Sequence, residues 1–201
     1  GQISYLWNIK REMGAVNKVF RGLATEHSEP ENSLFPLQEK PWIATLDTFA
    51  IGGGCQYLLV MDHIMAEKGS YMTLPARKEG IIPGMANLRL WRFTGDRIAR
   101  QAIQNGLTIH SDSTQGKLIC DEIIEKKSMD ESLLKTIDAY TNSGVVGSAS
   151  NRRAFRIGQE PLDTFRKYMS AYCHDQAYCH FSDALIKNLE NYWDAASRPL
   201  K

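Results

Sequence analysis

The sequence has almost no net charge and no long hydrophobic segment. Its 24 lysines and arginines against 23 aspartates and glutamates leave a formal net charge of +1, so composition gives no general attraction to nucleic acid or to an anionic membrane. No apolar segment approaches the roughly 20 residues that a membrane-spanning helix needs. No charged start is followed by the apolar core of a signal peptide. We therefore expect a cytoplasmic protein that binds neither nucleic acid nor membrane.

Cysteine is scarce, and its spacing does not indicate disulfides or a metal site. The sequence has only Cys55, Cys120, Cys173 and Cys179, with no paired CxxC motif. Reduced thiols in a cytosolic protein are the expected state. His174 and His180 each follow a cysteine, but spacings of one and six do not bring four ligands to one helical face, so we expect no metal.

Short strand-like segments alternate with helical patterns, and the last part of the chain is helical. Strands are predicted over 42–49, 64–66, 71–73 and 118–124. Helices are predicted over 5–21, 53–61, 86–93, 96–105, 131–140, 151–156, 162–178 and 182–193. This order predicts an α/β protein, with one core over 1–140 and a C-terminal helical region over 141–201.

Three consecutive glycines, Gly52, Gly53 and Gly54, stand between an apolar strand pattern and a helix pattern. Glycine allows bare backbone to approach a ligand, and the first N–H groups of a helix have no intrahelical acceptor. Such N–H groups suit a developing oxyanion. A glycine triplet is also typical of a tight turn or linker, so the surrounding residues must decide.

Those surrounding residues resemble the crotonase (enoyl-CoA hydratase/isomerase) superfamily. Its members read Lys-Pro, an apolar strand, Gly-Gly-Gly-Cys-Glu, and later Pro-Glu-x-x-x-Gly-x-x-Pro-Gly. Here the corresponding residues are Lys40-Pro41, 52–55 and 75–84, and the match continues to Gly106. The resemblance covers roughly the first two-thirds of the chain. It implies a crotonase-like spiral of ββα units with a C-terminal helical extension, an acyl-CoA substrate, and a homo-oligomer that is a trimer or a dimer of trimers.

The sequence departs from this pattern at the two acids that hydratases use. The glutamate after Gly-Gly-Gly-Cys is Gln56, and the glutamate after the proline is Ala76. Hydration needs a positioned titratable group within hydrogen-bond reach, and neither side chain titrates. The sequence therefore predicts an oxyanion site without the proton-handling acids of a hydratase.

Gln56, Ala76 and the segment 84–90 resemble a branch of the superfamily that oxidises an arylacetyl-CoA thioester. That branch uses O2 as co-substrate and no metal, flavin or other redox cofactor. The resemblance implies a set of roles for named residues. These are Gly53, Gln56 and Arg11 as catalytic residues, Ile51, Gly52, Gly54 and Gly84 as substrate-binding residues, and Ala76, Ile81 and Ile82 as an oxygen pocket.

The chain starts directly with a helical pattern, without the strand and turn that supply the second oxyanion N–H in this superfamily. We infer that a further N-terminal part of the same polypeptide completes the site. The aromatic residues after position 150 suit either burial in a partner subunit or the core of their own domain. Two other functions stay open. One is another acyl-CoA enzyme of this superfamily (isomerase, decarboxylase or thioesterase), and the other is a non-catalytic crotonase-like subunit.

Overall fold

The computed structural model describes residues 3, 6, 40–142 and 144–196, with side chains up to residue 191. The helix predicted over 5–21 and the predicted site residue Arg11 lie outside the described residues.

Within the described residues, six strands form two three-stranded sheets. The first sheet is parallel and contains β1 (Ile43–Leu46), β3 (His63–Glu67) and β6 (Glu122–Ile124), in the order β1-β3-β6. The second has the order β2-β4-β5 and contains β2 (Phe49–Ile51), β4 (Tyr71–Thr73) and β5 (Ile109–His110). β2 pairs parallel with β4, and β5 runs antiparallel to β4.

The single strand predicted over 42–49 is wrong, because the chain bends at Asp47 and Thr48 and passes from one sheet to the other. β3 and β4 make the same passage through a turn at Gly69, whose positive φ of 84° favours glycine. Ile43 is therefore opposite His63 in the first sheet, and Phe49 is opposite Tyr71 in the second. This paired course carries the end of β2 directly into the three glycines.

The strand predicted over 118–124 is also wrong in its first part. Only Glu122–Ile124 pairs as a strand, and Gly116–Leu118 forms a short 3-10 turn, η3. The N–H of Cys120 donates to the carbonyl of Gly116 at 2.8 Å. With this local hydrogen bond, Cys120 follows the turn and is buried in the core before the strand starts.

The helices agree with the predicted pattern apart from their ends. They are α3 (Gly53–Leu58), α4 (Ala76–Glu79), α5 (Ala86–Asn105), α6 (Met129–Thr141), α7 (Val145–Gln159), α8 (Leu162–Cys179) and α9 (Asp183–Ala196), with a second 3-10 turn, η4 (Lys126–Ser128). α4 was not predicted. α5 joins the two helices predicted over 86–105 across a kink at Gly95. No helix among the described residues is both long and apolar enough to cross a bilayer.

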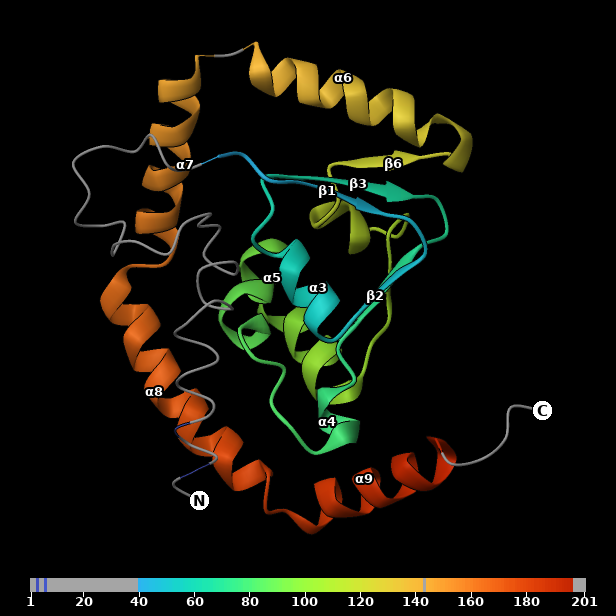
Figure 1. Ribbon diagram of the computed structural model, residues 1–201, viewed down its shortest axis with the longest axis vertical. Helices are drawn as coiled ribbons and strands as arrows, with labels where there is room; N and C mark the ends of the chain where they lie inside the picture. Colours follow the sequence, from blue (N-terminus) through green and yellow to red (C-terminus); the bar gives the residue numbers. More distant parts are fainter. Residues whose placement is uncertain (1–2, 4–5, 7–39, 143, 197–201) are drawn as a thin grey trace.

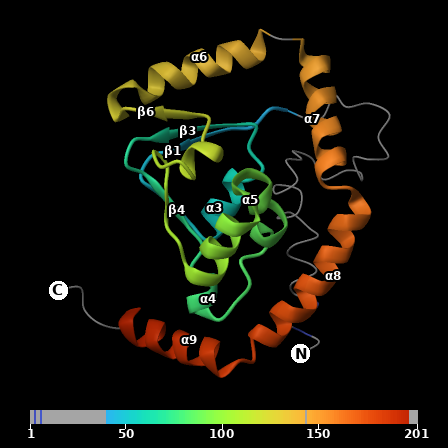
Figure 2. The same ribbon diagram turned by 180° about the vertical axis from the view of Figure 1, so that it is seen from behind.

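The first sheet lies between helices on both of its faces (Figures 1 and 2). Met65 of β3 packs with Ile124 and Met129 on the side of α6. Its neighbours Ile64 and Ala66 belong to the large core cluster on the side of α3 and α5. This alternation follows from the two-residue period of a strand.

Helices α7, α8 and α9 form a long arc around the core (Figures 1 and 2). Phe165 and Tyr172 of α8 are buried in the chain's own core beside Met85. Phe155 and Tyr178 are instead 67% and 71% exposed. Phe165 and Tyr172 therefore fill the core of their own chain, and burial of other C-terminal aromatics against a partner subunit stays a prediction.

Candidate active site

The glycine triplet forms the turn between β2 and α3. Gly52 has φ +55° and ψ −110°, a conformation that strongly favours glycine. Its N–H donates to the carbonyl of Thr73 in β4 at 2.9 Å, and its carbonyl accepts the N–H of Gln56 at 3.1 Å. Gly53 is the first residue of the helix, where an N–H has no intrahelical acceptor. A Cβ added to Gly53 would meet nothing within 4 Å, so the backbone here faces open space.

Gln56 lies on the first turn of α3 and is buried. Its Oε1 accepts the N–H of Met85 at 3.0 Å. A backbone N–H can only donate, so the carboxamide oxygen faces Met85 and the NH2 group is left as a donor. Gly84 makes this contact possible, because it has φ +49° and a Cβ there would overlap Gln56 Oε1. Position 56 therefore offers hydrogen-bond donors and no titratable group.

Ala76 begins the short helix α4, which ends in a glycine turn. Gly80 is left-handed, with φ 79°. Its N–H donates to the carbonyl of Arg77 at 3.2 Å, and the N–H of Ile81 donates to the carbonyl of Ala76 at 2.9 Å. This is the pattern of a Schellman C-cap. The cap holds Ile81 close to Ala76.

These segments meet around one cavity of about 650 Å³, which we call the glycine-turn cavity. The residues that line it are Gly52, Gly53, Gln56, Ala76, Glu79, Ile81, Ile82, Pro83, Gly84, Tyr172, Gln176, His180, Leu185 and Leu189. The structure thus brings together most of the residues predicted from sequence. It does not bring Ile51 and Gly54 to this lining. Ile51 is 42% exposed, and a Cβ on Gly54 would lie 3.8 Å from Ala50 of the preceding strand β2.

Sequence reasoning missed the contribution of α8 and α9 to this cavity. Tyr172, Gln176 and His180 are spaced four residues apart, which puts them on one face of α8. A glutamine within this face was the available signal. Leu185 and Leu189 of α9 add apolar surface to the cavity. Leu185 packs closely on Gly80, because a Cβ added to Gly80 would lie 3.0 Å from the backbone nitrogen of Leu185.

The one cysteine beside the glycine turn is not activated. Burial, and secondarily the neighbouring Cys120, raise the pKa of Cys55 from 9.0 to about 12. A thiol is a nucleophile or metal ligand as the thiolate. Cys55 is therefore a buried apolar side chain at neutral pH.

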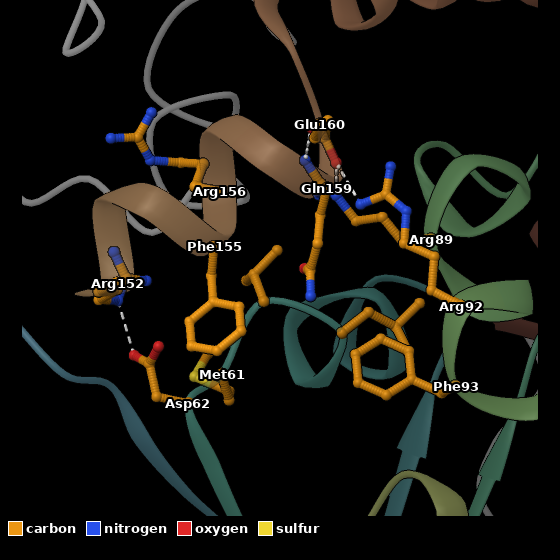
Figure 3. Close-up of a pocket in the computed structure, with 12 residues that line it drawn as sticks. Met61, Asp62, Arg89, Arg92, Phe93, Arg152, Phe155, Arg156, Gln159 and Glu160 are labelled. Atoms are coloured by element: carbon orange, nitrogen blue, oxygen red, sulfur yellow. Dashed lines mark hydrogen bonds and ion pairs between the residues drawn. The ribbon is translucent and has the colours of Figure 1, made fainter. Parts of the chain in front are cut away.

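A second cavity of about 260 Å³, the charged cavity, lies between α5 and α7 (Figure 3). Arg89 and Arg92 of α5 both bond to Glu160, which follows α7, at 2.8–3.0 Å. Arg152 of α7 donates to Asp62 Oδ2 at 2.7 Å, and the N–H of Trp42 donates to the same oxygen. These bonds connect the helical arc to the core.

Comparison with known proteins places this architecture in a family. The family model described as enoyl-CoA hydratase/isomerase matches residues 11–164. A (3,5-dihydroxyphenyl)acetyl-CoA 1,2-dioxygenase from Amycolatopsis orientalis is 42% identical over 169 residues, which are 84% of this chain and 37% of that protein. A carnitinyl-CoA dehydratase from Salmonella typhi is 24% identical over 151 residues, which are 73% of this chain and 58% of that protein.

Solved structures share the fold at low sequence identity. An enoyl-CoA hydratase from Mycobacterium avium subsp. paratuberculosis K-10 has a TM-score of 0.71 and 15% identity, covering 83% of this chain and 68% of that one. A carnitinyl-CoA dehydratase from Mycobacterium avium 104 has a TM-score of 0.60 and 21% identity, covering 73% and 58%. The predicted α/β crotonase-like fold is confirmed. The chain belongs to the enoyl-CoA hydratase/isomerase family.

Proposed function

We propose that this protein is a metal- and cofactor-independent dioxygenase that converts (3,5-dihydroxyphenyl)acetyl-CoA and O2 into 3,5-dihydroxyphenylglyoxylate and CoA. The observation that carries the proposal is one cavity that combines the glycine turn with Gln56 and Ala76. The 42% identity to a dioxygenase with this substrate supports it. The chain spans 37% of that relative, so the activity of the whole protein is itself a proposal.

The glycine turn supplies the first step. The Gly53 N–H is proposed to bind the thioester carbonyl oxygen, where charge collects when the α-carbon loses a proton. A preorganised donor of this kind typically contributes about 2.7–4 kcal/mol to the transition state. The dihydroxyphenyl ring spreads the carbanion charge further. The product of this step is an electron-rich enolate.

The second step is oxidation of that enolate by O2. The α-carbon passes from CH2 to C=O and gives four electrons to O2. Both oxygen atoms enter the arylglyoxylate, and the thioester C–S bond breaks to release CoA as its thiol. Ala76 and Gln56 have no proton that titrates, and Ile81 and Ile82 are proposed to line the oxygen pocket. A site that excludes water protects such an intermediate from side reactions.

The biological setting follows from the product. An arylglyoxylate of this type is the precursor of dihydroxyphenylglycine in vancomycin-type glycopeptide antibiotics. We propose this pathway, a trimer or dimer of trimers as the oligomer, and Arg11 as an anchor for a ring hydroxyl or an oxygen-derived anion. These proposals rest on the family resemblance.

The test is to follow dissolved oxygen and free CoA thiol together, with a chelator present, in air and without oxygen. The expected result is equal loss of O2 and gain of CoA, both absent anaerobically. CoA release that continues without oxygen would instead identify a thioesterase or another acyl-CoA enzyme of the family. No release from any arylacetyl-CoA would favour a non-catalytic subunit.

A further inference from the structure

Gln176 of α8 connects the Ile81–Ile82 segment, which forms one wall of the glycine-turn cavity, to the helical arc. Its Oε1 accepts the N–H of Ile82 at 2.9 Å. Its Nε2 lies 3.1 Å from Nε2 of His180. Gln176 is only 3% exposed, and all three residues line the cavity.

The orientation of this carboxamide follows from hydrogen-bond chemistry. The Ile82 N–H can only donate, so the oxygen of Gln176 must face it. The NH2 group then faces His180, and Nε2 of that imidazole must accept. In the neutral ring the proton is therefore on Nδ1. The Ile82 N–H thus fixes the orientation of Gln176, and His180 accepts from the other end of the same carboxamide.

The segment that Gln176 holds is short and is fixed on both sides. Ile81 is bonded to Ala76, and Gln56 Oε1 accepts the N–H of Met85. The hydroxyl of Tyr168 donates to the carbonyl of Gly84. Between these points Pro83 has no N–H to offer. Within the described part of the chain, the Ile82 N–H has Gln176 as its hydrogen-bond acceptor.

Packing reinforces the same connection. The side chain of Ile82 packs against the α8 cluster that contains Met169, Tyr172 and Cys173. A change at Gln176 would remove the polar contact and leave this apolar contact in place. The wall would then keep its partner helix but lose the bond that sets its exact position.

We propose that Gln176 is a positioning residue that keeps the Ile81–Ile82 wall closed against water. This inference rests on the proposed function, because it concerns the fate of the enolate. A displaced wall admits water, and water returns a proton to the α-carbon and regenerates the thioester. In deuterated solvent the regenerated thioester carries deuterium. The ratio of deuterium incorporated to O2 consumed therefore reports how well the wall is closed.

The first measurement is hydrogen exchange at the Ile82 amide in the purified protein. Gln176→Leu removes the acceptor, and exchange of this amide is expected to rise about 5- to 100-fold, as for the loss of one buried hydrogen bond. Gln176→Glu keeps an acceptor for Ile82, and its other oxygen can accept the N–H of the His180 tautomer that carries its proton on Nε2, so protection is expected to return. Gln159→Leu, on the charged cavity, is the matched control and should leave Ile82 unchanged.

The second measurement is the partition ratio with (3,5-dihydroxyphenyl)acetyl-CoA in deuterium oxide. Gln176→Leu should raise deuterium incorporation per O2 consumed at least about fivefold, and Gln176→Glu should restore it. A purely structural loss lowers both quantities together and leaves the ratio unchanged. Unchanged Ile82 exchange in Gln176→Leu would overturn the positioning role, and raised exchange with an unchanged ratio would overturn the water barrier. If the wild-type protein consumes no O2, the proposed function fails, while the exchange measurement still decides whether Gln176 holds the wall.

Discussion

The glycine-turn cavity and the charged cavity use polar groups in opposite ways. In the glycine-turn cavity, the two positions where hydratases carry acids hold Gln56 and Ala76, and Ile81 and Ile82 form one apolar part of the lining. In the charged cavity, Arg89 and Arg92 pair with Glu160, and Arg152 pairs with Asp62. The first arrangement presents backbone and carboxamide donors to a ligand, and the second holds helices together. We infer that substitutions in the first should reduce activity and that those in the second should reduce stability.

The largest predicted effect tests the charged cavity. Glu160→Gln removes the charge that Arg89 and Arg92 share, and breaking a buried ion pair on one side costs about 3–5 kcal/mol. The free energy of unfolding, measured in urea, should fall by that amount. Asp96→Asn is the control, because its pair with Arg100 is exposed and should change little. Equal effects of the two variants would contradict the structural role of Glu160.

Gly53→Val tests the other side of the comparison. Its Cβ has open space, so folding should be retained, but the side chain would fill the place proposed for the thioester oxygen. Loss of one such donor typically costs about 2.7–4 kcal/mol, so kcat/KM should fall about 10²- to 10³-fold. Gly147→Val on α7, whose Cβ also meets nothing, should keep full activity. Retained turnover in Gly53→Val would remove the oxyanion role.

Gly84→Ala should affect both stability and activity. The methyl group would overlap Gln56 Oε1 in a left-handed conformation, and overpacking of this kind costs about 1–3 kcal/mol. Displacing Gln56 also breaks its bond to Met85. The melting temperature and the rate of O2 uptake should both fall. Gly144→Ala, with open space around it, should change neither quantity. A variant with normal melting temperature and normal uptake would contradict the clamp on Gln56.

Ala76→Glu tests whether the absence of an acid at position 76 matters for the proposed reaction. A carboxylic acid at this position would return a proton to the enolate, so O2 uptake should fall about tenfold, the effect of about 1.4 kcal/mol. Ala76→Leu adds bulk without a proton and serves as the steric control. Uptake that is undiminished in the glutamate variant would remove the argument that position 76 must lack a proton donor.

The last predicted effect concerns pH and is absent at neutral pH. The pKa of Cys55 is raised to about 12 by burial, so the unfolded chain loses this proton at lower pH than the folded one. The associated stability is complete below the ordinary thiol pKa and is lost as pH rises from about 9 to 12, by at most about 1.4 kcal/mol per pH unit. Unfolding free energies of wild type and Cys55→Ala over this range should therefore differ in slope. Parallel curves would contradict the shift.

The parts of the site that are local in sequence were predictable. The glycine turn, Gln56 and the Ala76–Ile81 pair each depend on residues within a few positions, so motif spacing identified them. The contact of Gln176 with Ile82 was not predictable, because this hydrogen bond joins residues 94 positions apart. Only the packing of α8 on the segment after α4 brings them together.

The same distinction, between local and long-range contacts, explains the errors in the predicted secondary structure. The segment 42–49 has a continuous β pattern, and β propensity does not say which sheet a residue joins. The bend at Asp47 and Thr48 follows from pairing with β3 and β4, which is a tertiary effect. Helices with strong periodicity, such as α8 and α9, were predicted nearly to their ends.

The bond between Met85 and Gln56 also has a genetic consequence. Met85 requires one acceptor oxygen at position 56 and places no demand on the other terminal atom of that side chain. Glutamine and glutamate codons differ by a single nucleotide, so a carboxylate can enter here by a point mutation that the backbone contact tolerates. Random mutagenesis that screens for hydratase activity would therefore sample this change among its simplest variants. The nearest route from the proposed carbanion oxidation to proton transfer starts at a contact that already fits both side chains.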